Sequence, residues 1–260
     1  MKIATYDPNR TDAQWAYLKP MLPKPAKRGR PPKDRRHILD AILYLVKCGC
    51  PWRYLPADFP HWKTVHHIFR QWVHHHQWTG INDALRLLVR KTHDKRSRPT
   101  AAILDSQSVK SAGPGSPVGD DAGKRIKGRK RQRLVDALEL VLGVAVPPAN
   151  TTERDGASML LGRVLGWFTW LRILWVAGGY TGQAFAQWVK ALRPKLAVEV
   201  VKRSDDLAGF KVLPHRWVVE RTFGWLMHQR RLARDYETTA SSAEAWICLA
   251  MIQIQFLRLA

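Results

Sequence analysis

The spacing of apolar positions divides the chain into a helical first part and a second part that mixes strands with helices. In the first part apolar residues recur every three or four positions, which is the period of an amphipathic helix. We expect a short helix capped by Thr11 or Asp12 and ended by Pro20, and longer helices over Arg35–Lys47 and His61–Trp78. Helices joined by a short Pro-rich turn in a basic segment are typical of a helix-turn-helix module, although an ordinary helical bundle has the same period.

The character of the sequence changes near Pro99, where short β-branched runs begin. The expected strands are Ala101–Asp105, Arg133–Leu138, Leu140–Val146, Arg172–Val176 and Leu196–Val201. The expected helices are Glu153–Phe168, Gln183–Leu192, Pro214–Leu232 and Ala243–Leu257. Three strands followed by alternating helices and strands are the order of an RNase H-like fold. We therefore expect an α+β and α/β chain, with an all-helical domain at 1–98 and a mixed-sheet domain at 99–260.

The charge of the chain points to a polyanionic partner. There are 43 Lys and Arg residues against 21 Asp and Glu, a formal net charge of +22. Such an excess opposes folding by self-repulsion, and phosphate neutralisation with release of counterions rewards it. Nucleic acid is favoured over a membrane surface because the cations form no single amphipathic helix and no window reaches ~18 uninterrupted apolar residues. Without a signal-peptide core or a disulfide framework, we expect a cytoplasmic protein.

Two basic segments are candidates for contact with DNA. Lys27, Arg28 and Arg30 lie in a Pro-rich stretch that resembles a minor-groove arm, and a solvated linker would have the same composition. The second segment follows a Gly-rich loop, and we expect it to contact the DNA backbone beside Asp105 without reading bases. It holds seven cations in ten positions: Lys124, Arg125, Lys127, Arg129, Lys130, Arg131 and Arg133.

Five histidines, His66, His67, His74, His75 and His76, also suggest a metal site. Neighbouring positions on a helix point in different directions, and no Cys or carboxylate recurs at ligand spacing. Surface or phosphate-contacting roles are therefore favoured over metal binding.

Two carboxylates stand where nucleases and transposases with an RNase H-like fold place their acids. Asp105 ends the first predicted strand, and Glu220 lies in a late predicted helix. Such acids hold two divalent ions, one at the nucleophile and one at the leaving oxygen, and Mg²⁺ requires oxygen ligands. Asp105 and Glu220 are thus candidate catalytic and metal-binding residues for Mg²⁺ or Mn²⁺.

Several motifs, in order, resemble those of the DDE transposases of bacterial insertion sequences, in the group conventionally numbered five. They are Gly49–Pro56, Asp105–Lys110, Lys127–Arg131, Leu134–Asp136, Pro148–Asn150, Asp155–Ala157, His215–Leu226, Arg230–Leu232 and Asp235–Glu237. The resemblance implies an enzyme that binds terminal inverted repeats and target double-stranded DNA, cuts at the element ends and transfers the 3′-hydroxyls to target DNA. It further implies a homodimer or larger homo-oligomer, located with the bacterial nucleoid, and DNA-contacting roles for Arg230 and Arg231. Arg216 would either contact DNA or help to fix Glu220.

The chain departs from the family at one catalytic position. The second acid of the family lies in an Ala-Asp-Gly-Gly-Tyr-like run, and here Ala177 precedes Gly178, Gly179 and Tyr180. A methyl group cannot bind a metal ion, so we expect cleavage and strand transfer to be impaired. Engineered inactivation and natural decay both account for Ala177. The alternative function is that of a non-catalytic, repressor-like DNA-binding protein derived from a transposase.

Overall fold

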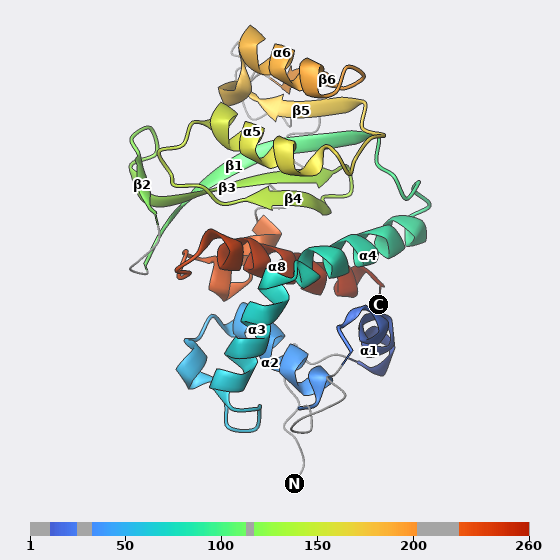
Figure 1. Ribbon diagram of the computed structural model, residues 1–260, viewed down its shortest axis with the longest axis vertical. Coiled ribbons are helices and arrows are strands. Elements are labelled where there is room, and N and C mark those ends of the chain that lie inside the picture. The colour runs from blue at the N-terminus through green and yellow to red at the C-terminus, as the bar shows by residue number, and fades with distance from the viewer. Residues whose placement is uncertain (1–10, 25–32, 113–116, 202–223, 260) are drawn as a thin grey trace, which may run out of the picture.

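The computed structural model describes residues 11–24, 33–112, 117–201 and 224–259. Helices gather at one end of the molecule, and a β-sheet with two helices on it forms the other end (Figure 1). The helical layer consists of α1 (Asp12–Leu18), α2 (Arg35–Cys48), α3 (Trp62–His74), α4 (Gln77–Thr92) and α8 (Ala240–Leu259). Short 3₁₀ turns lie at Lys19–Met21, Trp52–Tyr54 and Arg230–Leu232.

Local signals explain where the first helices begin and end. Thr11 and Gln14 form a reciprocal capping box at the start of α1. α2 ends at Gly49, whose φ of 68° is the left-handed conformation that glycine adopts without strain. The prediction of a single helix over His61–Trp78 was wrong, because the chain turns at His75 and His76 and starts α4. His76 itself has a φ of 52°.

Within the described residues the sheet has six strands, and its order confirms the expected mixed topology. The strands are β1 (Ala101–Lys110), β2 (Gly119–Asp121), β3 (Ile126–Asp136), β4 (Val141–Ala145), β5 (Ile173–Ala177) and β6 (Ala197–Val201). They run in the order β2-β3-β1-β5-β6, with β4 also paired to β3. The pairs β1–β3, β2–β3 and β3–β4 are antiparallel, whereas β1–β5 and β5–β6 are parallel. A helical part followed by this mixed sheet is the predicted fold class, with an RNase H-like second part.

Two strands are longer than predicted. β1 continues for five residues past Asp105, and β3 begins at Ile126 rather than at Arg133. Both extensions belong to the same antiparallel pair, whose register runs from Ala102 opposite Asp136 to Lys110 opposite Gly128. The basic segment is therefore mostly part of strand β3.

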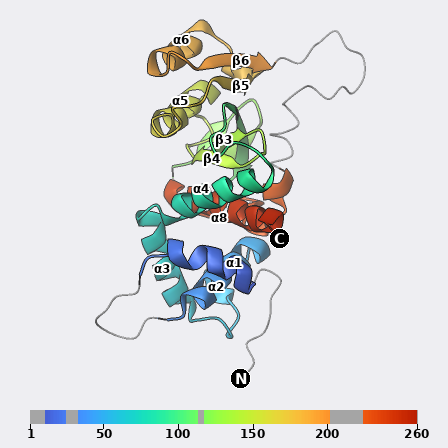
Figure 2. The ribbon, with the colours of Figure 1, turned by 90° about the vertical axis from the view of Figure 1, so that its right-hand side faces the viewer.

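Helices α5 (Glu153–Val164) and α6 (Gln183–Leu192) lie along one side of the sheet (Figure 2). Thr152 caps α5 by accepting from the backbone of Asp155, and two acids in the first turn oppose the positive end of the helix dipole. Apolar residues of α5, α6 and the strands, such as Leu104, Leu161 and Leu174, form one core cluster.

The helical layer has its own core, and the last helix of the chain completes it. α8 packs on α2, α3 and α4, so residues from both ends of the sequence share one apolar cluster. Gln253 donates to the Leu43 carbonyl at 3.0 Å, and Gln255 donates to the Asn82 carbonyl at 3.2 Å. Among the described residues, α8 alone is long and apolar enough to span a membrane, but 72% of its apolar window is buried in the protein. It is a core helix.

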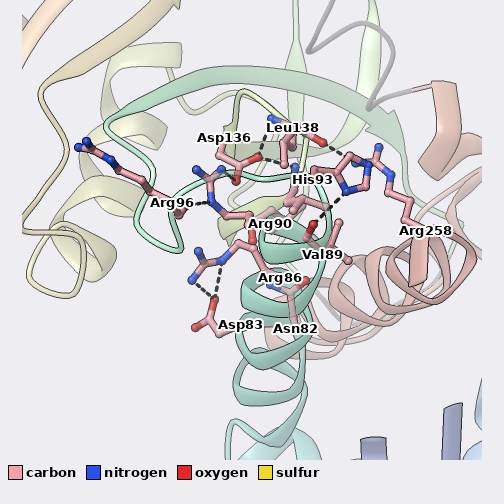
Figure 3. A network of polar contacts seen from close by, with 12 residues as sticks. Asn82, Asp83, Arg86, Val89, Arg90, His93, Arg96, Asp136, Leu138 and Arg258 are labelled. Atoms are coloured by element: carbon pink, nitrogen blue, oxygen red, sulfur yellow. Dashed lines mark hydrogen bonds and ion pairs between the residues drawn. The ribbon is translucent and has the colours of Figure 1, made fainter. Parts of the chain in front are cut away.

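A polar network joins the helical layer to the β3–β4 turn (Figure 3). Arg90 of α4 donates to the buried Asp136 at 2.5 Å, and Asp136 in turn accepts from the backbone of Leu138 and Leu140. Arg258 of α8 donates to the Leu138 carbonyl at 2.6 Å and pairs with Glu139. The turn is thus fixed from two helices that lie far apart in the sequence.

Candidate active site between β1 and β5

The predicted acid Asp105 lies in the middle of β1, at the point where the neighbouring strand β5 ends. The parallel pairing of β1 with β5 runs from Ala101 opposite Ile173 to Leu104 opposite Val176. One step further along this register, Asp105 and Ala177 stand next to each other on adjacent strands. Ala177 is the last residue of β5, and the 3₁₀ turn Gly178–Tyr180 follows it.

Asp105 occupies a half-buried position that makes its negative charge costly. One of its carboxylate oxygens accepts from the Ser106 backbone N–H at 2.7 Å. Burial raises the pKa of Asp105, while this hydrogen bond, Arg133 and Lys124 act in the opposite direction and Glu153 adds to the rise. Arg133 is the residue opposite Asp105 on β3. A charged acid kept in such a place is typical of a functional site.

Glu153, which the sequence did not identify as a site residue, places a second carboxylate beside Asp105. As the first residue of α5, it accepts from the Ser106 hydroxyl at 3.3 Å and forms an ion pair with Lys124 at 3.4 Å. It also lies against the turn after Ala177, because a Cβ added to Gly179 would collide with its Oε2. In the sequence, acidic residues after Thr152 mark the start of a helix. They do not indicate that this start lies beside Asp105.

Tyr180 closes the inner side of the site. Its hydroxyl donates to the Gln132 side chain at 2.9 Å, and Gln132 in turn lies against the start of α5. Burial, together with the charge of Asp105, raises the pKa of Tyr180, so the phenol stays protonated and serves as a hydrogen-bond donor.

The described residues offer an incomplete set of metal ligands. No group of three or more His, Cys, Asp or Glu side chains suited to a metal ion occurs in the described ranges. At the site itself, Asp105 and Glu153 supply carboxylate oxygens, the donor type that Mg²⁺ prefers, and Ala177 supplies none. The predicted third acid, Glu220, lies outside the described residues, as does Arg216.

The structure corrects the prediction that the whole basic segment faces DNA. Lys124, Arg125 and Lys127 are exposed, but Arg129, Lys130 and Arg131 are only 1%, 5% and 4% exposed. The prediction that these last three contact phosphate from the surface is wrong.

Each of the three buried cations has a partner within the protein. Arg129 pairs with Asp235 at 3.1 Å and donates to the Glu237 carbonyl at 3.0 Å. Arg131, on the same face of β3, donates to two carbonyls of residues 232–234. Lys130, on the opposite face, donates to the Thr151 carbonyl at 2.8 Å and lies 3.5 Å from Asp121. These acids lie far from the strand in sequence or across a loop, so local charge density did not reveal them.

The other predicted DNA contacts in the described residues also include one exposed and one buried side chain. Arg230 is exposed, whereas Arg231 is buried, pairs with Glu237 at 2.5 Å and donates to the Cys50 carbonyl at 3.1 Å. Arg231 therefore connects the segment before α8 to the loop after α2, and its prediction as a DNA contact was wrong. Lys27, Arg28 and Arg30 lie outside the described residues.

A cationic hollow lies near the start of β3. Its volume is about 370 Å³, and its lining residues are Lys110, Ser111, Val118, Arg125, Lys127 and Arg234. Lys110 and Arg234 were not among the predicted DNA contacts. Four of the six described lining residues are cations and none is an acid, a composition that favours a phosphate group as the ligand.

The fold defines the class of this protein, and matches to known proteins define its family. An RNase H-like sheet with an acid on its central strand defines a class of nucleases and transposases. A family model described as "Transposase DDE domain" matches residues 96–254, and one described as "Putative transposase of IS4/5 family" matches residues 11–82. The chain belongs to the DDE transposases. A relative, the "Insertion element IS402 uncharacterized 16.2 kDa protein" of Burkholderia cepacia, is 31% identical over 115 residues, 42% of this chain and 77% of that protein.

Proposed function

We propose that this chain is an insertion-sequence transposase of group five that binds the terminal inverted repeats of its element, and that Ala177 impairs its cutting activity. The observation that carries the proposal is the register of β1 and β5. It brings Asp105 and Ala177 side by side where two parallel strands diverge. A carboxylate at position 177 would face the same space as Asp105, and this chain has a methyl group there.

The residues of the chain would act on the scissile phosphate by position and charge. Divalent ions such as Mg²⁺ or Mn²⁺, when bound, activate the attacking oxygen and stabilise the leaving one. Asp105 and Glu220 are the proposed ligands, with Asp105 fixed by the Ser106 backbone. Ala177 leaves this set one oxygen donor short, so an ion would be held in the wrong place or not at all.

The proposed path for DNA follows the exposed cations near Asp105. Lys124 is close enough to the site to lower the pKa of Asp105 and pairs with Glu153. Arg125 and Lys127 line the cationic hollow together with Lys110 and Arg234. These residues replace the buried Arg129, Lys130 and Arg131 as the proposed backbone contacts of the sheet domain.

The helical part is the proposed reader of the element ends, with residues 1–98 as the DNA-binding domain and 99–260 as the catalytic one. α8 contributes to the core of the helical layer, so a fragment of residues 1–98 would expose the surfaces that α8 covers. Binding studies should therefore use the full chain. Because two ends are joined in transposition, we further propose that a homodimer or larger homo-oligomer assembles on double-stranded DNA in the bacterial nucleoid.

Restoring the acid tests this function. Ala177→Asp should acquire Mg²⁺-dependent cutting of DNA that carries the inverted repeats flanking the gene, while the unaltered chain binds the same DNA and cuts it poorly. Adding Asp105→Asn to Ala177→Asp should abolish the cutting again, which guards against a contaminating nuclease. End-specific binding without cutting by any variant would instead support the repressor-like alternative.

A further inference from the structure

Helix α3 presents a row of cationic and histidine side chains that the proposed function has not used. Lys63, His67, Arg70 and His74 are all exposed and follow one another at intervals of three or four residues. Side chains at such intervals lie on one face of a helix. From Lys63 to His74 the row is about 16 Å long, at a rise of about 1.5 Å per residue.

The opposite face of α3 is firmly anchored. Val65, Phe69 and Trp72 are buried, and Phe69 stacks on Trp246 of α8 with ring centroids 4.6 Å apart. Trp52, in the preceding 3₁₀ turn, also packs on Phe69 at 5.3 Å. The exposed row is therefore held by a rigid support, which reduces the entropy lost when it binds a ligand.

The charge of this face has one sign. α3 contains no acidic residue. Arg53, from the turn before α3, and Lys63 both lie over the ring of Trp62, at 5.6 and 5.8 Å from its centroid. A hollow of about 420 Å³ adjoins the row and is lined by His67, Arg70, Gln71, His74 and His75. Such a face has no partner among the described residues that would neutralise it.

His66 differs from the other histidines of this helix because it faces inward. It packs edge-on against Trp52 at 4.8 Å. Burial lowers the pKa of His66, with Arg70, His67 and Arg231 adding to the effect and Glu237 opposing it. His66 is therefore not part of the exposed row.

We propose that this face of α3, defined by Lys63, His67, Arg70 and His74, binds the phosphate backbone of duplex DNA. The inference rests on the proposed function, since it assumes that DNA is the partner. It adds the surface of the helical part that contacts the DNA. A length of about 16 Å matches roughly five base-pair steps of a duplex. A straight row of that length can contact several phosphates of one strand.

The test uses the full chain and a 30-base-pair duplex of mixed sequence, with affinity measured between 50 and 200 mM salt. Lys63→Ala combined with Arg70→Ala should weaken binding and flatten the plot of log affinity against log salt, by about one unit for each phosphate that the variant no longer neutralises. The matched control, Lys190→Ala with Lys195→Ala, removes two exposed cations on and after α6, at the far end of the molecule (Figure 1), and should leave the slope unchanged.

Lys63 and Arg70 are both exposed, so the thermal unfolding midpoint of the double variant should match that of the unaltered chain.

The possible failures are distinguishable. An unchanged salt slope in the Lys63 and Arg70 variant, in a chain that binds the duplex, would overturn the role of α3 and leave the proposed function standing. No binding by the unaltered chain to the mixed-sequence duplex or to a duplex that carries the inverted repeats would overturn both the inference and the proposed function.

Discussion

Strand β3 and helix α3 both carry cations, but β3 buries most of its cations, whereas α3 exposes Lys63 and Arg70. From Arg129 to Arg133 the strand has a helix on one side and the segment 232–237 on the other, so its cations are buried against acids and carbonyls. α3 buries its aromatic face and leaves its cations exposed. A strand in the middle of a sheet can be covered on both faces, whereas a surface helix is covered on one. High charge density alone therefore does not identify a DNA-binding surface.

The largest effect that this comparison predicts is on stability. Arg129→Met should lower the free energy of unfolding by about 3–5 kcal/mol, because it leaves Asp235, which is 2% exposed, without its cation. Denaturant-induced unfolding measures this loss. Lys127→Met, an exposed position on the same strand, should change stability by no more than about 0.5 kcal/mol. If Arg129→Met instead kept full stability and lost affinity for DNA, our account of β3 would be wrong.

A smaller loss is expected two residues further along the same face. Arg131 donates to the carbonyls of Leu232 and Arg234, and burial lowers its pKa to about 10. Arg131→Met should cost about 1–3 kcal/mol, since it removes hydrogen bonds but leaves no buried carboxylate directly paired with it. Arg131→Met and Arg129→Met are best compared in the same unfolding experiment. Equal losses in the free energy of unfolding would mean that an unpaired Asp235 carboxylate is not the cause of the larger loss expected for Arg129→Met.

The smallest effect concerns Asp105 and depends on pH. Burial raises the pKa of Asp105, so the folded chain binds this proton more tightly than the unfolded chain, and the ionised acid destabilises the fold at neutral pH. Asp105→Asn should therefore unfold at a higher temperature than the unaltered chain at pH 7. The gap should shrink as the pH falls through the raised pKa of Asp105 in the folded chain and should close below the ordinary value of 3.8, where Asp105 is neutral in both states. A gap that does not vary with pH would argue against this origin.

The sequence predicted those elements whose ends are marked by local start or stop signals. Gln183–Leu192 was predicted to the residue, and the helix expected to begin at Glu153 does begin there, although it ends at Val164 rather than at Phe168. The start of β3 was missed because Arg and Lys usually occupy exposed positions, and the partners that bury them here are set by the tertiary fold. The break between α3 and α4 has neither Gly nor Pro, and it relies on His76 in a conformation that few residues adopt.

The candidate site was predictable only in part. Asp105 and Ala177 were identified from their motifs, and their adjacency follows from strand register, which requires the fold. Glu153 was missed although it touches Ser106, because 47 residues separate the two and no local pattern connects them. The roles of Asp105 and Glu220 as metal ligands stay predictions.

The most direct test of the central claim is the rate of cutting by three chains that differ only at position 177. We predict that Ala177→Asp cuts element-end DNA about 100-fold faster or more than the unaltered chain, because the charge stabilisation supplied by a bound metal is worth several kcal/mol and ~1.4 kcal/mol is a factor of ten. Ala177→Asn, of similar shape but uncharged, should remain far slower than Ala177→Asp. If the unaltered chain cuts as fast as Ala177→Asp, position 177 is not the place of the second acid.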